Sequence, residues 1–112
     1  MSLSIDAKYN ETKESWVVNL IGDLDINSSV TLKDRLNDIL DQKESDIEFH
    51  ISELAYIDST GLGVMISLLN RLDKNENAMV INDPQENVYK IFKITGLNKV
   101  ITIRKEGERI DG

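Results

Sequence analysis

Residues 56–69 read YIDSTGLGVMISLL, and this stretch contains the end of a strand, a tight turn and the start of an apolar helix. The turn residues Asp58, Ser59 and Thr60 are all types that favour the N-cap of a helix. Apolar residues then recur at helical spacing: Leu62, Met65, Ile66, Leu69 and Leu72. The pattern predicts a core-facing helix over residues 60–74, with a serine hydroxyl at its N-terminus.

Ser59 has two possible roles. Free N–H groups and the helix macrodipole attract anions to a helix N-terminus, so an exposed serine there is a suitable place for a phosphate. Alternatively, Ser59 only caps the helix, which is the usual role of an N-terminal serine. The residues alone leave both interpretations open.

Two glycines, Gly61 and Gly63, follow in the first helical turns. Each weakens an isolated helix by roughly 1 kcal/mol relative to alanine, so the pair indicates that something comes close to this backbone. We expect a partner to approach Gly61, which is next to the serine turn. For Gly63, close packing of the helix on the sheet is the alternative.

The remaining chain predicts one α/β domain over residues 1–112. Strands are expected at residues 3–9, 16–21, 46–52, 78–81 and 100–103, and helices open at residues 27–29, 60 and 84. The order ββαβαβαβ predicts a mixed sheet with an N-terminal antiparallel hairpin, then parallel strands joined by right-handed crossovers. The core spans about residues 3–104, and we expect residues 105–112 to be a mobile tail.

Several local features are predicted within this frame. Residues 53–57 form a loop with Leu54 and Tyr56 turned inward, and Pro84 occupies the first position of the last helix after an Asn82 or Asp83 cap. The first helix has an apolar stripe at Leu32, Leu36, Ile39 and Leu40. The last helix has an inner face of Val88, Ile91, Phe92 and Thr95, and it stops at Gly96.

Bulk properties narrow the function classes. The 112 residues are 40% hydrophobic and 29% charged, with a net charge of −7 and no cysteine. The acidic balance disfavours direct binding to nucleic acid or to an anionic membrane. It would suit a basic protein partner, although solubility explains it equally well. Without cysteine or a long apolar run, we expect a cytoplasmic protein with no membrane-attached form.

Catalytic chemistry is hard to build from these residues. His50 is the single histidine, in mid-strand, and no acidic cluster has metal-ligand spacing. We therefore expect no enzyme and no cofactor. Asp23 and Asp25 follow the second strand and Asp58 follows the third, so they share one sheet edge. They are either an acidic surface around Ser59 or ordinary turn residues.

Residues 58–63, DSTGLG, resemble the signature of the STAS domain family, specifically the bacterial anti-sigma factor antagonists. Residues 22–25, GDLD, are similar to that family's Gly-Glu-Leu-Asp segment, with Asp23 in place of glutamate. Residues 82–84 and 95–97 resemble the start of its last helix and the turn after it. The resemblance covers about residues 3–104 and implies a STAS-like fold.

The resemblance also implies a mechanism in transcription regulation. The unphosphorylated domain binds an anti-sigma factor with serine kinase activity, which releases a sigma factor. The kinase uses ATP and Mg²⁺ to phosphorylate Ser59, and a phosphatase reverses the switch. The partner-binding positions that it implies are Asp23, Asp25, Asp58, Thr60, Gly61, Leu62 and Gly63. The alternatives are a non-phosphorylated accessory STAS subunit of a membrane transporter, and a small-ligand-binding STAS module or enzyme at the acidic edge.

Overall fold

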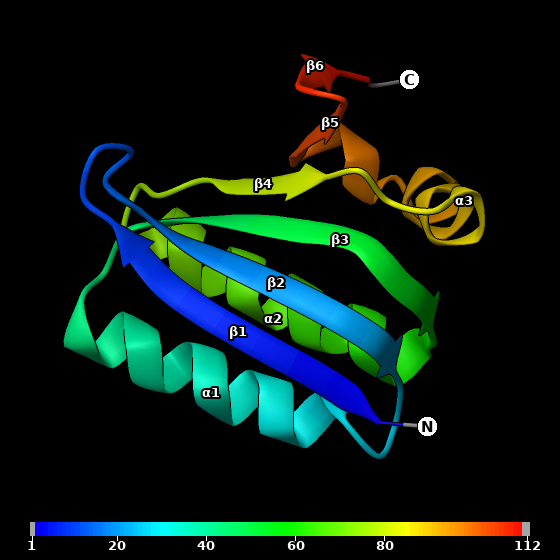
Figure 1. Ribbon diagram of the computed structural model, residues 1–112, viewed down its shortest axis with the longest axis horizontal. Helices are drawn as coiled ribbons and strands as arrows, with labels where there is room; N and C mark the ends of the chain where they lie inside the picture. Colours follow the sequence, from blue (N-terminus) through cyan, green and yellow to red (C-terminus); the bar gives the residue numbers. More distant parts are fainter. Residues whose placement is uncertain (1, 111–112) are drawn as a thin grey trace.

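The computed structural model describes residues 2–110, in which six strands form one mixed sheet in the order β1-β2-β3-β4-β5-β6 (Figure 1). The N-terminal hairpin is antiparallel, β2 to β5 are parallel, and β6 returns antiparallel to β5. The strands are β1 (Leu3–Asn10), β2 (Ser15–Leu24), β3 (Asp46–Ile57), β4 (Met79–Asn82), β5 (Thr102–Lys105) and β6 (Glu108–Arg109). The predicted α/β class with a mixed sheet is confirmed.

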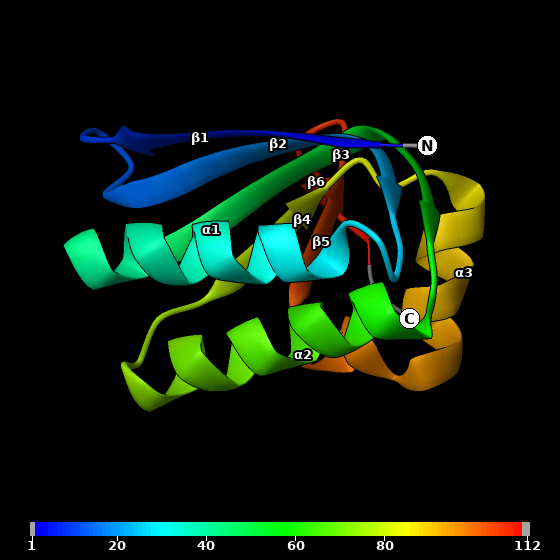
Figure 2. The same cartoon turned by 90° about the horizontal axis from the view of Figure 1, so that it is seen from below.

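Helices cover one face of this sheet. Both α1 (Ser29–Gln42) and α2 (Ser59–Lys74) lie beneath the strands in Figure 2, and α3 (Glu86–Thr95) packs beside the end of β3. A short 3-10 helix, η1 (Leu97–Lys99), follows α3. Within residues 2–110, no helix covers the opposite face of the sheet. That face is therefore open, as the alternating β3 sequence requires.

The core lies between the sheet and the two helices. The predicted stripe of α1 is fully in place, with Leu32, Leu36, Ile39 and Leu40 all buried. Facing them, β2 and β3 contribute buried residues in alternation: Trp16, Val18, Leu20, Ile47, Phe49 and Ile51. Burial of aliphatic and aromatic side chains on this scale is the main stabilising contribution, at roughly 1.5–3 kcal/mol for each fully buried large side chain. It holds the carboxyl ends of β2 and β3 in fixed positions.

Three expectations near the start of α2 are wrong. Residues 53–57 continue β3 instead of forming a loop, because they pair with the end of β2. Leu54 is buried, but Tyr56 is 49% exposed, because a register shift against β2 interrupts the strand alternation between these two residues. Ile66, assigned to the core stripe of α2, is 42% exposed. The predicted residues Met65, Leu69 and Leu72 are buried, and so are Val64 and Leu68, which the prediction did not include.

The predicted start of α3 is also wrong. The helix begins at Glu86 with Gln85 as its N-cap, so Pro84 precedes it. Asp83 is unable to cap the helix because it is held elsewhere: its N–H donates to the Arg104 carbonyl at 2.7 Å, and its carboxylate accepts from the Glu106 amide at 2.7 Å. On the inner face of α3, Val88 and Phe92 are buried, whereas Ile91 is half-buried and Thr95 is exposed. Gly96 ends the helix in the left-handed region, as predicted (φ 78°).

Regular structure continues after the last parallel strand. The last parallel strand begins at Thr102 instead of residue 100, and the chain then turns back to form β6. The Ile110 amide donates to the Ile103 carbonyl at 2.8 Å, which continues this return. The predicted tail therefore contains a turn and a strand as far as residue 110, and its last two positions lie outside the described residues.

Candidate functional site

The candidate site lies where β2 and β3 end side by side. Leu24 is the register partner of Ile57, and the Asp58 amide donates to the Leu24 carbonyl at 3.2 Å. Ser29 begins α1 shortly after β2, and Ser59 begins α2 directly after Asp58. Parallel pairing thus brings two strand ends and two helix N-termini to one edge, which is where ligands and partners of α/β sheets bind.

Asp58 joins these elements. Its side chain accepts from the Gly61 amide at 3.0 Å and from the Ile26 amide at 3.2 Å. The first bond caps α2 and the second ties the β2–α1 loop to that cap. Asp58 is therefore the N-cap of the helix, and this leaves Ser59 as the first helical residue.

Ser59 and Thr60 are both exposed at the first turn of α2. Among the described residues, neither hydroxyl has a hydrogen-bond partner, so capping does not occupy Ser59. The first amides of a helix have no partner within that helix, and Asp58 satisfies the one at Gly61. The amides of Ser59 and Thr60 remain available to an anion, together with the positive end of the helix dipole.

The two other aspartates differ in role. The Asp25 carboxylate accepts from the Asn27 amide at 2.9 Å and the Ser28 amide at 3.1 Å, which makes it a turn-stabilising residue. Ser28 in turn donates its hydroxyl to the Asp23 carbonyl at 2.8 Å. Asp23 is half-buried, with no hydrogen bond to its carboxylate among residues 2–110. The edge is acidic, but the Asp25 carboxylate already accepts hydrogen bonds from amides of its own loop.

The two glycines have different surroundings in the structure. Gly61 is buried, and a Cβ there would lie 2.6 Å from Leu24 Cγ, 2.7 Å from the Leu24 carbonyl oxygen and 3.1 Å from Ile57 Cγ1. Its missing side chain lets α2 approach the end of β2. Gly63 is exposed, and a Cβ there would meet nothing within 4 Å. Close packing within the chain thus requires Gly61, and Gly63 is the glycine that faces outward.

An apolar surface surrounds the serine. Leu62 and Ile66 follow Ser59 at spacings of three and seven residues, so they share its face of α2. Ile26, 68% exposed, lies on the loop that Asp58 holds against this helix start. We call Ile26, Ser59, Leu62, Gly63 and Ile66 the serine face. The sequence pattern assigned Ile66 to the core and gave no role to Ile26. A helical wheel drawn from Ser59 would have placed Ile66 on the same face as the serine.

Lys13, Glu48 and His50 form a separate network away from this edge, on the open face of the sheet. The buried Glu48 carboxylate lies 2.9 Å from His50 Nε2 and 3.2 Å from Lys13 Nζ, and it accepts from Asn82 Nδ2 at 3.2 Å. His50 is half-exposed, and its strand pairs on both sides, so it is a surface residue of an inner strand. Residues 2–110 contain no group of three or more potential metal ligands. No helix there has the length and apolar character needed to cross a membrane.

The fold and the site together define a class of structure: a mixed α/β domain with an exposed serine at the start of a capped helix. The STAS domain family model matches residues 6–109, and the chain belongs to this family. A curated relative is the anti-sigma-B factor antagonist of Bacillus subtilis (strain 168), 30% identical over 108 residues, which are 96% of each chain.

Solved structures share the fold. The phosphorylated form of the Bacillus cell fate determinant SpoIIAA matches with a TM-score of 0.72 at 20% identity, covering 92% of this chain and 93% of that one. An anti-sigma factor antagonist from Mycobacterium paratuberculosis matches with a TM-score of 0.75 at 16% identity, covering 91% and 85%. At these identities the likeness concerns the fold alone.

Proposed function

We propose that this chain is an anti-sigma factor antagonist whose binding to an anti-sigma factor is switched off by phosphorylation of Ser59. The observation that carries the proposal is the exposed, unbonded Ser59 hydroxyl at the start of α2, in a STAS domain whose full-length relative bears that name. Its role is regulatory binding rather than catalysis.

The serine face supplies the binding surface in this proposal. Ile26, Leu62 and Ile66 offer apolar area beside the phosphoacceptor, and Gly63 leaves room for close approach. Asp23 and Thr60 are the polar contacts at its margin. Asp58, Gly61 and Asp25 act indirectly, because their contacts hold the helix start and the β2–α1 loop in place.

Phosphate acts on the interface rather than on the fold. It adds about −1.5 to −2 charges at pH 7. The free amides and dipole of α2 favour such a charge by about 0.3–1 kcal/mol in the isolated domain. A docked partner would have to desolvate that charge among apolar side chains, which is strongly unfavourable unless a cation pairs with it. The phosphorylated domain therefore stays folded and releases its partner.

The partner in this proposal is an anti-sigma factor with serine kinase activity, which supplies ATP and Mg²⁺, and a phosphatase removes the phosphate. The domain needs no cofactor of its own. The release of sigma factor follows when the unphosphorylated serine face occupies the anti-sigma factor.

The test is to incubate the chain with such a kinase and ATP, and to map phosphate by mass spectrometry. We expect one phosphate on Ser59, none in Ser59→Ala, and normal transfer in the matched control Thr60→Ala. Phosphate on Thr60, or persistent transfer to Ser59→Ala, would contradict the assignment. If the chain binds without any transfer and is recovered from cells in a membrane complex, the accessory-subunit alternative holds instead.

A further inference from the structure

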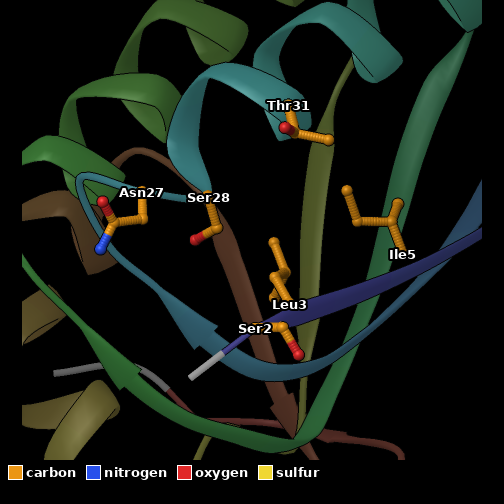
Figure 3. Close-up of a pocket in the computed structure, with 6 residues that line it drawn as sticks. All are labelled: Ser2, Leu3, Ile5, Asn27, Ser28 and Thr31. Atoms are coloured by element: carbon orange, nitrogen blue, oxygen red, sulfur yellow. The ribbon is translucent and has the colours of Figure 1, made fainter.

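The β1 strand forms an open edge of the sheet. It pairs with β2 on one side only, over eight residues, and no other strand of the described chain borders it. Its core-facing side chains, Leu3, Ile5, Ala7 and Tyr9, are only partly buried. Beside them, a hollow of about 290 Å³ opens between Leu3 and Ile5 of β1 and Ser28 and Thr31 at the start of α1 (Figure 3). A long open edge of this kind is a template for pairing with another strand.

The ladder determines which backbone groups this edge presents. The Asp23 amide donates to the Ser2 carbonyl at 3.3 Å, and the β1–β2 register continues from there without a bulge. Hydrogen-bonded pairs alternate with non-hydrogen-bonded pairs in an antiparallel ladder. The even-numbered residues of β1 therefore bond to β2, and the N–H and C=O groups of Ile5, Ala7 and Tyr9 point outward.

We propose that β1 pairs antiparallel with β1 of a second copy of this chain, about a twofold axis at Ala7. In this register, Ala7 faces Ala7, and Ile5 faces Tyr9 of the second copy. These are the residues whose backbone groups point outward, so they form the hydrogen-bonded pairs. Asp6 then faces Lys8 of the second copy on the open side of the sheet, and the twofold axis repeats this ion pair.

The charges on β1 select this register. Shifting the axis by one residue places Asp6 opposite Asp6 in one direction and Lys8 opposite Lys8 in the other, and like charges directly opposite are destabilising. With the axis at Ala7, both charged residues meet an opposite charge in a non-hydrogen-bonded pair. Side chains in such pairs lie closer than in hydrogen-bonded pairs. The edge is therefore self-complementary in one register.

The side chains on the core side fit the same arrangement. Tyr9 packs edge-to-face on Trp16 with 5.4 Å between ring centroids, so its ring is already held in position. In the dimer it lies against Ile5 of the other copy, where the hollow leaves room. Aromatic and β-branched side chains form favourable cross-strand pairs. No residue of the serine face belongs to β1, so the pairing leaves Ser59 accessible.

Sedimentation equilibrium on the full chain tests this proposal by charge reversal. Asp6→Lys and Lys8→Asp each create two like-charge pairs, and each should weaken dimerisation about tenfold. The double variant Asp6→Lys with Lys8→Asp restores opposite charges in the same register, and it should dimerise like the native chain. Equal dimerisation of all four proteins, or failure of the double variant to recover, would overturn the register.

A backbone variant tests the edge itself. The Ala7 amide points away from β2, so Ala7→Pro removes no bond of the ladder, and proline is tolerated at such edge positions. We expect it to fold, by circular dichroism, and to remain monomeric. Ser59→Asp is the matched control, and it should dimerise normally. A native chain that stays monomeric up to about 1 mM, or an Ala7→Pro variant that folds and still dimerises, would refute the proposal.

Discussion

Replacing Gly61 by alanine tests the close approach of α2 to the end of β2. The new Cβ would lie 2.6 Å from Leu24 Cγ and 2.7 Å from the Leu24 carbonyl oxygen. The Leu24 side chain can rotate, but its carbonyl accepts the Asp58 amide at 3.2 Å and is part of the sheet end. Relief of the overlap therefore requires α2 to move away from β2, which would lengthen that hydrogen bond.

The expected change in the free energy of unfolding of Gly61→Ala has two opposing contributions. Overpacking at a buried site costs about 1–3 kcal/mol, and the backbone contact places Gly61 towards the upper end of that range. Alanine recovers roughly 1 kcal/mol of helix propensity. The net loss is about 2 kcal/mol, which lowers the melting temperature by roughly 8 °C in a domain of this size.

The matched control is Gly63→Ala, two residues later in the same helix. A Cβ at Gly63 meets nothing within 4 Å, so the propensity term acts alone. The melting temperature should rise by a few degrees, corresponding to a gain of up to about 1 kcal/mol. Differential scanning calorimetry on both variants measures the contrast. A Gly61→Ala protein at least as stable as the native chain would refute the close-packing explanation for Gly61.

Three further predictions concern single side chains. In calorimetric titrations, Ser59→Ala should bind the anti-sigma factor as tightly as the native chain. Ser59→Asp should have an affinity between those of the native chain and the phosphoprotein, because one carboxylate carries less charge than phosphate. Equal affinities of the two variants would exclude the electrostatic switch. Asp58→Ala removes the acceptor of two amides, Gly61 and Ile26, and should cost about 2 kcal/mol in urea unfolding, whereas a loss near zero would show that water replaces the cap. Arg71 is paired with Glu44 at 2.6 Å and Asp41 at 2.8 Å, and these two carboxylates raise its pKa, so the guanidinium is charged at neutral pH and loses its contribution as the pH rises through that raised pKa in strong alkali. Because both carboxylates are exposed and Arg71 is only partly buried, Arg71→Ala should cost about 0.5–1 kcal/mol, and less at high salt. A larger, salt-independent loss would point to a packing role.

Much of the fold could be predicted because its signals are local or periodic. The α1 stripe from Leu32 to Leu40 is a helical repeat, and helical periodicity reports directly which face is buried. The cap at Asp58 and the left-handed stop at Gly96 are short-range preferences of single residues. Strand–helix–strand order then limited the connections to parallel crossovers.

Predictions failed where a distant contact decides the outcome. Helical spacing alone puts Ile66 in line with Leu62 and Leu69, but the position of α2 on the sheet leaves Ile66 at the surface. Asp83 is a good cap by type, yet its amide donates to Arg104 of β5 and its carboxylate accepts from Glu106 in the β5–β6 turn.

The sequence by itself predicted a polar turn before a core helix, and its resemblance to the STAS family made Ser59 the candidate phosphoacceptor. The tertiary structure decided what surrounds that serine. Sequence shows two glycines of equal cost in one helix, whereas only the assembled strands show that Leu24 blocks a side chain at Gly61 and that nothing blocks one at Gly63. Likewise, β1 reads as an ordinary alternating strand, and the order of strands in the sheet makes it an open edge. Propensity and periodicity are properties of neighbouring residues, but close approach and edge exposure depend on segments that are far apart in the chain.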